Sequence, residues 1–488
     1  MIMRIDNENR AAVPSLLERQ SRGGDIGEGG VTFQAEAVLA MVPAWLAEEG
    51  FTSLVRESIG DAEAKFFVPG VGYRKDLIES KDHTISPSEF WEELDRFSQI
   101  ANGSGEEYRS FTLACTGLSS TLQPLAADLR RIIGPRKFYR GSSIFESSYQ
   151  QFRDRVVGFG RSESDAILLF DRVSILDDLS MTSDKGRVLF RDSLTACFPS
   201  FGDLPERILN NIYSDLAIFL RDERNKTISR MDLERIIHNG LPDVSPLRIV
   251  SPIRINTLSK PGGQDEIRGP IFLDLSDFFG GQSRDYPPAE EWDGRLIGQL
   301  KETKQWILDN RNTRKLLLSG ERRLSSALAI GSVFSAVSGF SIEMQHRDAA
   351  YATNAHANQS TPEYDLWIET VGRTQGERLV VAIGIVRKIS EDVDAYLKAC
   401  DLGDATRLLI EGATPIFSAE QANLIVGKIK SAISEALDRS KAKQIDLFIA
   451  APSFLALFIG HRLNATAPVQ CYEWLGPGNY VKTCKLPV

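Results

Sequence analysis

Two stretches of the chain carry the same pattern, and together they decide the fold of its C-terminal half. Residues 315–344 read KLLLSGERRLSSALAIGSVFSAVSGFSIEM, and residues 445–474 read IDLFIAAPSFLALFIGHRLNATAPVQCYEW. Each begins with an apolar run typical of a buried strand, passes a tight turn, continues as a helix of small residues and ends in a second strand. Both helices contain the dipeptide Ile-Gly, at 330–331 and at 459–460. We interpret the two stretches as an internal repeat.

The residues around the repeat predict how its two copies are built. Between them lie two further apolar runs, at 377–386 and 405–413, and a long helical segment at 418–442. Strands that alternate with helices indicate parallel sheets with helices on both faces. We therefore expect residues 250–488 to form two Rossmann-like halves related by a pseudo-two-fold axis. Ligands of such folds bind at the carboxyl ends of the strands.

The N-terminal region predicts a different, smaller α/β domain within residues 1–140. Its patterns give a helix, three strands, a helix, a strand and a helix in that order. The segments are 31–50, 51–57, 61–70, 71–81, 86–105, 107–115 and 119–133. The whole chain is thus expected to be a multidomain α/β protein.

The middle of the chain looks like a connection between these parts. Residues 141–245 show helical periodicity without strand patterns, so we expect a helical subdomain or connector there. A stretch rich in Pro and Gly at about 242–290 is poor in strand patterns and indicates the boundary with the last domain.

One set of polar residues in the N-terminal domain suggests chemistry. Glu79 and Lys81 are two residues apart on a predicted strand, so their side chains point to the same face. Asp61 stands at the start of the preceding strand and offers a second carboxylate. Carboxylate oxygens suit Mg²⁺ or Mn²⁺, and a lysine beside them can approach the attacking water or a phosphate. The set predicts metal-dependent phosphodiester hydrolysis, with Asp61 and Glu79 as metal ligands.

The turn in the first copy of the repeat predicts an anion site. Ser319 ends the strand, and the helix that follows opens with Arg322, Arg323 and Ser325. Backbone N–H groups at a helix N-terminus, with arginines beside them, suit an anionic phosphodiester.

The second copy and several aromatic residues extend this predicted site. The equivalent turn contains Pro452 and Ser453 at the start of its helix. Tyr351, Tyr472 and Trp474 lie near the ends of predicted strands, where their rings could stack on bases.

Composition limits the class of protein. A net charge of −9 argues against a protein that coats nucleic acid by charge alone. The five cysteines lack CxxC spacing and no two of the five histidines stand at metal-ligand spacing, which argues against a zinc site or a disulfide framework and fits a reducing cytosol. No apolar run approaches the ~18 residues of a membrane span, and the N-terminus lacks the apolar core of a secretory signal.

The region around Asp61 resembles one branch of the PD-(D/E)xK nuclease superfamily. The similarity rests on ESIGDAEAKFF at 57–67 and DLIESKDHTISPSEFWEELDRF at 76–97, within the helix and strand order given above. The resemblance implies accessory roles for Gln34 on the first helix and for Glu57. The chain departs from the pattern in lacking a proline before Asp61.

The C-terminal residues, from about 290 to 488, resemble the SAVED domain, a fusion of two CARF-like units. The similarity rests on SGERRLSSALAIG at 319–331, IAAPSFLALFIG at 449–460 and the terminal VQCYEW and YVKTCKL. SAVED domains accompany diverse effectors in bacterial anti-phage signalling by cyclic oligonucleotides (CBASS). The resemblance implies that a cyclic tri- or dinucleotide binds this domain, promotes self-assembly and activates cleavage of double-stranded DNA.

Two other functions stay open at this point. A restriction-type nuclease would read modified DNA with its C-terminal half and need no messenger, although a duplicated Rossmann-like unit differs from a basic reader domain. A nuclease-dead, nucleotide-regulated DNA-binding protein would not need the complete set of Asp61, Glu79 and Lys81.

Overall fold

The computed structural model describes residues 28–179 apart from 137 and 140, then 185–242, 252–260, and 269–487 apart from 284, 348, 373–375, 403 and 404. The chain divides into two compact units, with described residues 28–242 in the first and 252–487 in the second. Each unit has its own sheets and is considered by itself.

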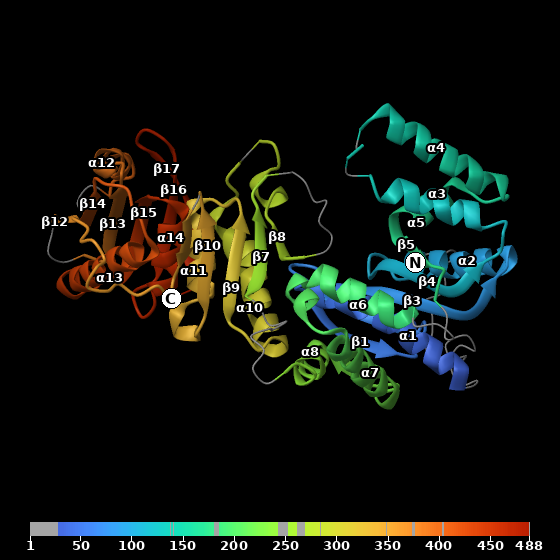
Figure 1. The fold of residues 1–488 in the computed structure, drawn as a ribbon. Helices are drawn as coiled ribbons and strands as arrows, with labels where there is room; N and C mark the ends of the chain where they lie inside the picture. Colours follow the sequence, from blue (N-terminus) through green and yellow to red (C-terminus); the bar gives the residue numbers. More distant parts are fainter. Residues whose placement is uncertain are drawn as a thin grey trace, which may run out of the picture. The chain divides into compact units, whose positions relative to one another are not determined.

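The first unit is built on one six-stranded sheet (Figure 1). In sheet order its strands are β5 (Val173–Leu176), β4 (Tyr108–Leu118), β3 (Gly72–Ile85), β2 (Ala62–Val68), β1 (Phe51–Arg56) and β6 (Thr227–Ser229). The pairs β6–β1, β1–β2 and β2–β3 are antiparallel, whereas β3–β4 and β4–β5 are parallel.

Helices cover both faces of this sheet and form two separate cores. They are α1 (Glu28–Ala47), α2 (Pro87–Gly103), α3 (Gln123–Ile133), α4 (Ser143–Gly158), α5 (Glu163–Arg172), α6 (Lys185–Cys197), α7 (Glu206–Asp222) and α8 (Arg230–Asn239). One core joins α1 with α6, α7 and α8, and the other joins α2 with α3, α4 and α5. The order predicted from the sequence up to residue 133 is confirmed.

Residues 141–245, expected to be a helical subdomain or connector without strands, contain the helices α4 to α8 but also strands. Strands β5 and β6 extend the sheet at its two edges, and α6, α7 and α8 pack on α1 within the same compact unit. These strands are only 4 and 3 residues long, too short for an alternating pattern to appear in the sequence.

The second unit contains two mostly parallel sheets. The first has the order β11 (Ala349–Ala352), β10 (Ser341–His346), β9 (Lys315–Gly320), β7 (Ile253–Leu258) and β8 (Ile271–Asp274). The second has the order β12 (Trp367–Val371), β14 (Thr406–Gly412), β13 (Arg378–Ile385), β15 (Gln444–Ala450), β16 (Val469–Gly476) and β17 (Asn479–Leu486). The helices are α9 (Ala289–Glu291), α10 (Gly298–Asn310), α11 (Leu324–Val333), α12 (Ser390–Ala399), α13 (Ala419–Ser440) and α14 (Ser453–Arg462).

The stretch at 242–290 was expected to be poor in strands, but β7 and β8 lie within it. Strand β7 occupies an inner position of its sheet, between β8 and β9. In its sequence IRINTL the alternate residues Ile253, Ile255 and Thr257 are buried. The surrounding Pro and Gly residues concealed a strand of six residues.

The two halves of the second unit meet through α11 and α14 (Figure 1). A Cβ atom at Gly331 would stand 2.1 Å from the carbonyl oxygen of Leu457, and one at Gly460 would stand 2.1 Å from that of Leu328. Both glycines are therefore required by the close approach of the helices. The contact is reciprocal, since each pair is related by the same shift of 129 residues (460 less 331, and 457 less 328). The internal repeat is thus present in the structure as a symmetric helix crossing.

His461 lies at this crossing, and we predict that it makes the stability of the second unit depend on pH. Its ring is buried and contacts the carbonyl oxygen of Phe334 through Nδ1 at 2.7 Å. Burial lowers the pKa of His461 from 6.5 to about 4. Between these values the unfolded chain binds a proton that the folded chain does not, so stability falls as the pH falls from 6.5 to 4, by roughly 3 kcal/mol at most.

Thermal unfolding at several pH values checks this prediction. The wild-type protein should lose more stability than His461→Gln when the pH is lowered from 6.5 to 4.5. Parallel losses in the two proteins would contradict it.

Candidate functional site

The predicted catalytic residues of the first unit come together on β2 and β3. The antiparallel register pairs Ala62 with Ile78, which sets Asp61 opposite Glu79. Asp61 Oδ2 accepts a hydrogen bond of 2.6 Å from the backbone N–H of Ser80, and Glu79 Oε1 lies 3.2 Å from Lys81 Nζ. The three side chains named from the sequence therefore form one cluster.

Burial and charge give this cluster unusual electrostatics. Burial and the neighbouring Glu79 carboxylate raise the pKa of Asp61 to about 7. Burial would lower the pKa of Lys81, but Glu79 and Glu93 outweigh it and raise that pKa. The lysine therefore stays protonated beside two carboxylates that repel one another.

Helix α2 adds two residues that the sequence analysis did not identify. Glu93 Oε1 lies 2.8 Å from Lys81 Nζ, so the amine stands between two carboxylates. Arg96 Nη1 lies 2.7 Å from Glu79 Oε2. The available signal was the spacing of Glu93 and Arg96 on the helix that follows β3, because i and i+3 positions share one helix face.

The two accessory candidates have different places in the structure. Gln34 on α1 donates from Nε2 to Asp61 Oδ1 at 2.7 Å, so it belongs to the cluster. Glu57 does not join it, because its carboxylate pairs with Arg224 instead. Glu57 has a φ of 57°, in the left-handed region, and its backbone N–H donates to the carbonyl oxygen of Asp61 at 2.8 Å.

The residues present fit a divalent metal ion. Asp61 and Glu79 are two closely spaced carboxylates, and Gln34 Oε1 is buried without a hydrogen-bond partner beside them. Among the described residues no group of three or more His, Cys, Asp or Glu side chains is placed to hold a metal. Mg²⁺ commonly binds through one or two carboxylates and completes its shell with water and phosphate oxygens, so this donor set suits Mg²⁺ or Mn²⁺.

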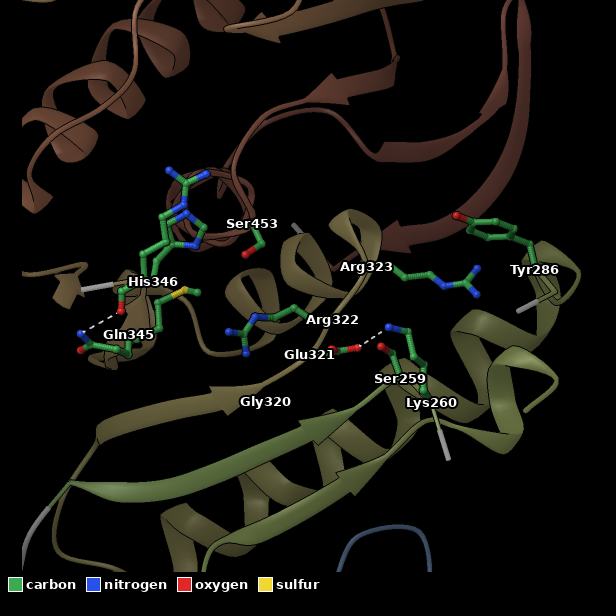
Figure 2. A pocket seen from close by; sticks show the side chains of 12 residues that line it. Ser259, Lys260, Tyr286, Gly320, Glu321, Arg322, Arg323, Gln345, His346 and Ser453 are labelled. Atoms are coloured by element: carbon green, nitrogen blue, oxygen red, sulfur yellow. Dashed lines mark hydrogen bonds and ion pairs between the residues drawn. The ribbon is translucent and has the colours of Figure 1, made fainter. Parts of the chain in front are cut away.

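The second unit has a cavity of about 590 Å³ at the carboxyl ends of parallel strands, where a ligand was expected (Figure 2). Residues at the carboxyl ends of β9 and β10 and just after β7, β9 and β10 line it, together with Tyr286 and with Ser453 at the start of α14. Its cationic or imidazole side chains are Lys260, Arg322, Arg323, His346 and Arg347. Glu321 also lines the cavity and is paired with Lys260.

Arg322 is the central cation of this cavity and points toward His346 (Figure 2). It donates to the carbonyl oxygen of Ser319 at 3.1 Å, while its Nε is buried without a partner. Burial lowers the pKa of Arg322 to about 10. Ser319 thus holds the arginine through its backbone and is not among the residues that line the cavity.

The N-terminus of α11, where a phosphate was predicted to bind, is capped by a carboxylate of the chain itself. The N–H of Ser325 donates to Glu473 Oε1 at 2.7 Å, and its hydroxyl lies 2.7 Å from that of Thr483. Ser325 is fully buried. The Glu473 carboxylate from β16 occupies the position at the helix N-terminus that was predicted for the ligand. Arg323 points the other way from Arg322 and lies over the rings of Phe279 and Tyr286 at 4.2 and 4.0 Å (Figure 2).

A second cavity of about 430 Å³ adjoins the first and is mostly apolar. The two cavities share His346 and Arg347. Pro452 lines the second cavity together with Tyr351, whose ring stacks on Phe454 at 3.9 Å. Phe417 is 74% exposed on the same wall. We call the two cavities together the trough, with a cationic part and an apolar part.

Tyr472 and Trp474, which were predicted to bind the ligand, are not among the described residues that line the trough. Tyr472 is 2% exposed and stacks on Phe448 in an aromatic core. Trp474 is partly exposed beneath Arg387. Side chains alternate between the two faces of β16. Which face meets the trough depends on how the strand is paired, and the local sequence does not reveal this.

Comparisons with known proteins identify the class of the second unit. Residues 299–486 match the model of the SMODS-associated and fused to various effectors sensor domain (SAVED). The Acinetobacter baumannii Cap4 SAVED/CARF-domain containing receptor with the cyclic trinucleotide 2'3'3'-cAAA is 26% identical, with a TM-score of 0.80 over 95% of this chain and 100% of that one. The Moraxella osloensis Cap4 receptor is 28% identical, with a TM-score of 0.77 over 94% and 100%.

Similarity over the whole length gives the family. The chain is 31% identical over 486 residues to CD-NTase-associated protein 4 of Moraxella osloensis. The aligned region covers 97% of this chain and 99% of that protein. The chain belongs to the CD-NTase-associated protein 4 (Cap4) family, the CBASS effectors that carry a SAVED receptor domain. Among the described residues no helix is both long and apolar enough to span a membrane.

Proposed function

We propose that this protein is a metal-dependent endonuclease that cleaves double-stranded DNA after a cyclic oligonucleotide binds its SAVED domain. The observation that carries the nuclease assignment is the convergence of Asp61, Glu79 and Lys81 from two adjacent strands. A carboxylate pair with a protonated lysine is the arrangement that phosphodiester hydrolysis needs.

The residues of the cluster have different roles in the proposed cleavage reaction. Asp61 and Glu79 would hold a Mg²⁺ ion, which when bound would supply an activated water and offset charge on the phosphate. Ser80 and Gln34 donate hydrogen bonds to the two oxygens of Asp61 and fix its carboxylate. Lys81 offers its protonated amine to the phosphate oxygens, where charge increases in the transition state.

The trough supports binding of a cyclic tri- or dinucleotide. The Acinetobacter baumannii relative contains a cyclic trinucleotide, a ligand that has both charged phosphates and flat bases. The cationic part, centred on Arg322, suits the phosphodiesters, and the apolar part with Tyr351 and Pro452 suits the bases. A local concentration of positive charge on a chain of net charge −9 favours an anionic ligand at this place.

We further propose that the ligand activates the nuclease by self-assembly. The net charge of −9 gives the free chain little attraction for DNA, and a nuclease without sequence readout must be kept inactive in its host. A ligand moves such an equilibrium from about 1:99 to 99:1 only if it prefers the active state by ~5.5 kcal/mol. Several charge-assisted contacts of ~1.5–3 kcal/mol each would provide that preference.

Plasmid cleavage measured together with light scattering tests this function. Purified protein is incubated with Mg²⁺ or excess EDTA, and with or without each of a panel of cyclic di- and trinucleotides. We expect cleavage and assembly only when the metal and one of the nucleotides are both present. Cleavage by the monomer without any nucleotide would favour the restriction-type alternative. Assembly without cleavage in every condition would favour the nuclease-dead alternative.

A further inference from the structure

Both carboxylate oxygens of Glu79 are bonded to cations of the chain itself. Lys81 Nζ lies 3.2 Å from Oε1, and Arg96 Nη1 lies 2.7 Å from Oε2. The side chains of Glu79 and Arg96 are only 10% and 15% exposed, so little water competes for these bonds. In this state each oxygen of Glu79 already has one cationic partner.

Arg96 has a second carboxylate within reach. The same Nη1 lies 3.4 Å from Glu93 Oε2, and Nη2 donates to the carbonyl oxygen of Ile59. Glu93 and Arg96 are at i and i+3 on α2, so their separation is fixed by the helix. A small rotation of the guanidinium would exchange Glu79 for Glu93 without leaving the arginine buried and unpaired, which would be costly.

We propose that Arg96 is a positioning residue that occupies the metal's place on Glu79 in the resting protein and moves to Glu93 when a metal binds. This inference rests on the proposed function, because it takes Asp61 and Glu79 as the metal ligands. Arg96 satisfies Oε2 of the buried Glu79 carboxylate, while Lys81 contacts only Oε1. The cost is that every metal ion competes with an ion pair already made, which weakens metal binding by the resting enzyme.

Removal of Arg96 should therefore strengthen metal binding. We expect Arg96→Gln to bind Mn²⁺ about tenfold more tightly, a change that equals about 1.4 kcal/mol and lies near the contribution of one hydrogen bond to a charged group. A purely structural arginine would give the opposite sign, since its loss would loosen α2 around Glu79.

Calorimetric titration of the full chain with Mn²⁺ alone, without DNA or nucleotide, measures this affinity. The matched control is Arg161→Gln, which loses the same charge but contacts Asp95 of α2 instead of Glu79. The control should bind Mn²⁺ as the wild type does. Asp61→Asn should lose Mn²⁺ binding, which reports on the metal site independently of Arg96.

The outcomes separate this inference from the proposed function. Unchanged or weaker affinity in Arg96→Gln, with binding lost in Asp61→Asn, overturns the role of Arg96 alone. Absence of Mn²⁺ binding in the wild type and in Arg96→Gln overturns the metal site and this inference with it. If Arg96→Gln does not fold, Arg96→Lys decides. Arginine reaches Glu79 and Ile59 with two separate nitrogens, which the shorter lysine does not have, so the affinity of Arg96→Lys for Mn²⁺ should rise about threefold, and no rise overturns the proposal.

Discussion

Lys81→Ala should reduce plasmid cleavage by at least ~10²-fold and leave cyclic nucleotide binding unchanged. Lys81 Nζ stands between Glu79 and Glu93 at 3.2 and 2.8 Å, which keeps the amine protonated beside the place where a phosphate would bind. Loss of one group that stabilises transition-state charge commonly costs 10²-fold or more in rate. Asp61→Asn should have an effect of the same order, because it removes one of two carboxylates available to the metal. Initial rates of supercoiled plasmid loss measure both.

The matched control for Lys81 is another lysine of the same strand. Lys75 on β3 pairs with Glu107 and Glu63, and its replacement by alanine removes the same charge. We expect Lys75→Ala to cleave within a few-fold of the wild type. Full cleavage by both Lys81→Ala and Asp61→Asn would show that the active site lies elsewhere.

Arg322→Glu should weaken binding of the cyclic nucleotide by at least ~100-fold and abolish activation at nucleotide concentrations that saturate the wild type. Arg322 has a buried Nε without a partner and has no acidic neighbour among the described residues that shifts its pKa, so its charge is available to an anion. The substitution removes charge-assisted hydrogen bonds of ~1.5–3 kcal/mol and adds repulsion of the phosphates. Equilibrium binding of the nucleotide that activates the wild-type protein measures the loss.

Two control measurements test whether the loss of nucleotide binding is specific to Arg322. Arg314→Glu makes the same charge change at an exposed residue bonded to the Ser338 carbonyl, and it should bind the nucleotide normally. Arg322→Glu should still bind Mn²⁺ as the wild type does, since the metal site belongs to the first unit. Activation of Arg322→Glu at wild-type nucleotide concentrations would contradict the assignment of the cationic part of the trough.

Arg323 illustrates why only one of two adjacent arginines suits this test. The sequence makes Arg322 and Arg323 equal candidates for the ligand. In the structure Arg323 lies over Phe279 and Tyr286 and donates to the Asp285 carbonyl oxygen, so its loss would also disturb the wall of the trough. Consecutive residues at the start of a helix point in different directions, and packing decides which of them meets the cavity.

The sequence by itself determined the features that depend on local periodicity. Strand alternation placed Glu79 and Lys81 on one face, and apolar runs broken by turns gave the element order of the first unit up to residue 133. The repeated Ile-Gly dipeptide identified two equivalent helices, and these prove to cross at Gly331 and Gly460. Such patterns are legible because a strand or helix fixes the direction of each side chain from its neighbours alone.

Only the tertiary structure decided which distant groups meet those side chains. Glu473 caps Ser325 from a position 148 residues away, and Glu57 pairs with Arg224 across 167 residues. The spacing of Glu93 and Arg96 shows that they share one helix face, but only the packing of α2 brings Arg96 to Glu79. Long-range partners are chosen by packing and by the need to satisfy every buried polar group, and these depend on the whole fold rather than on the local sequence.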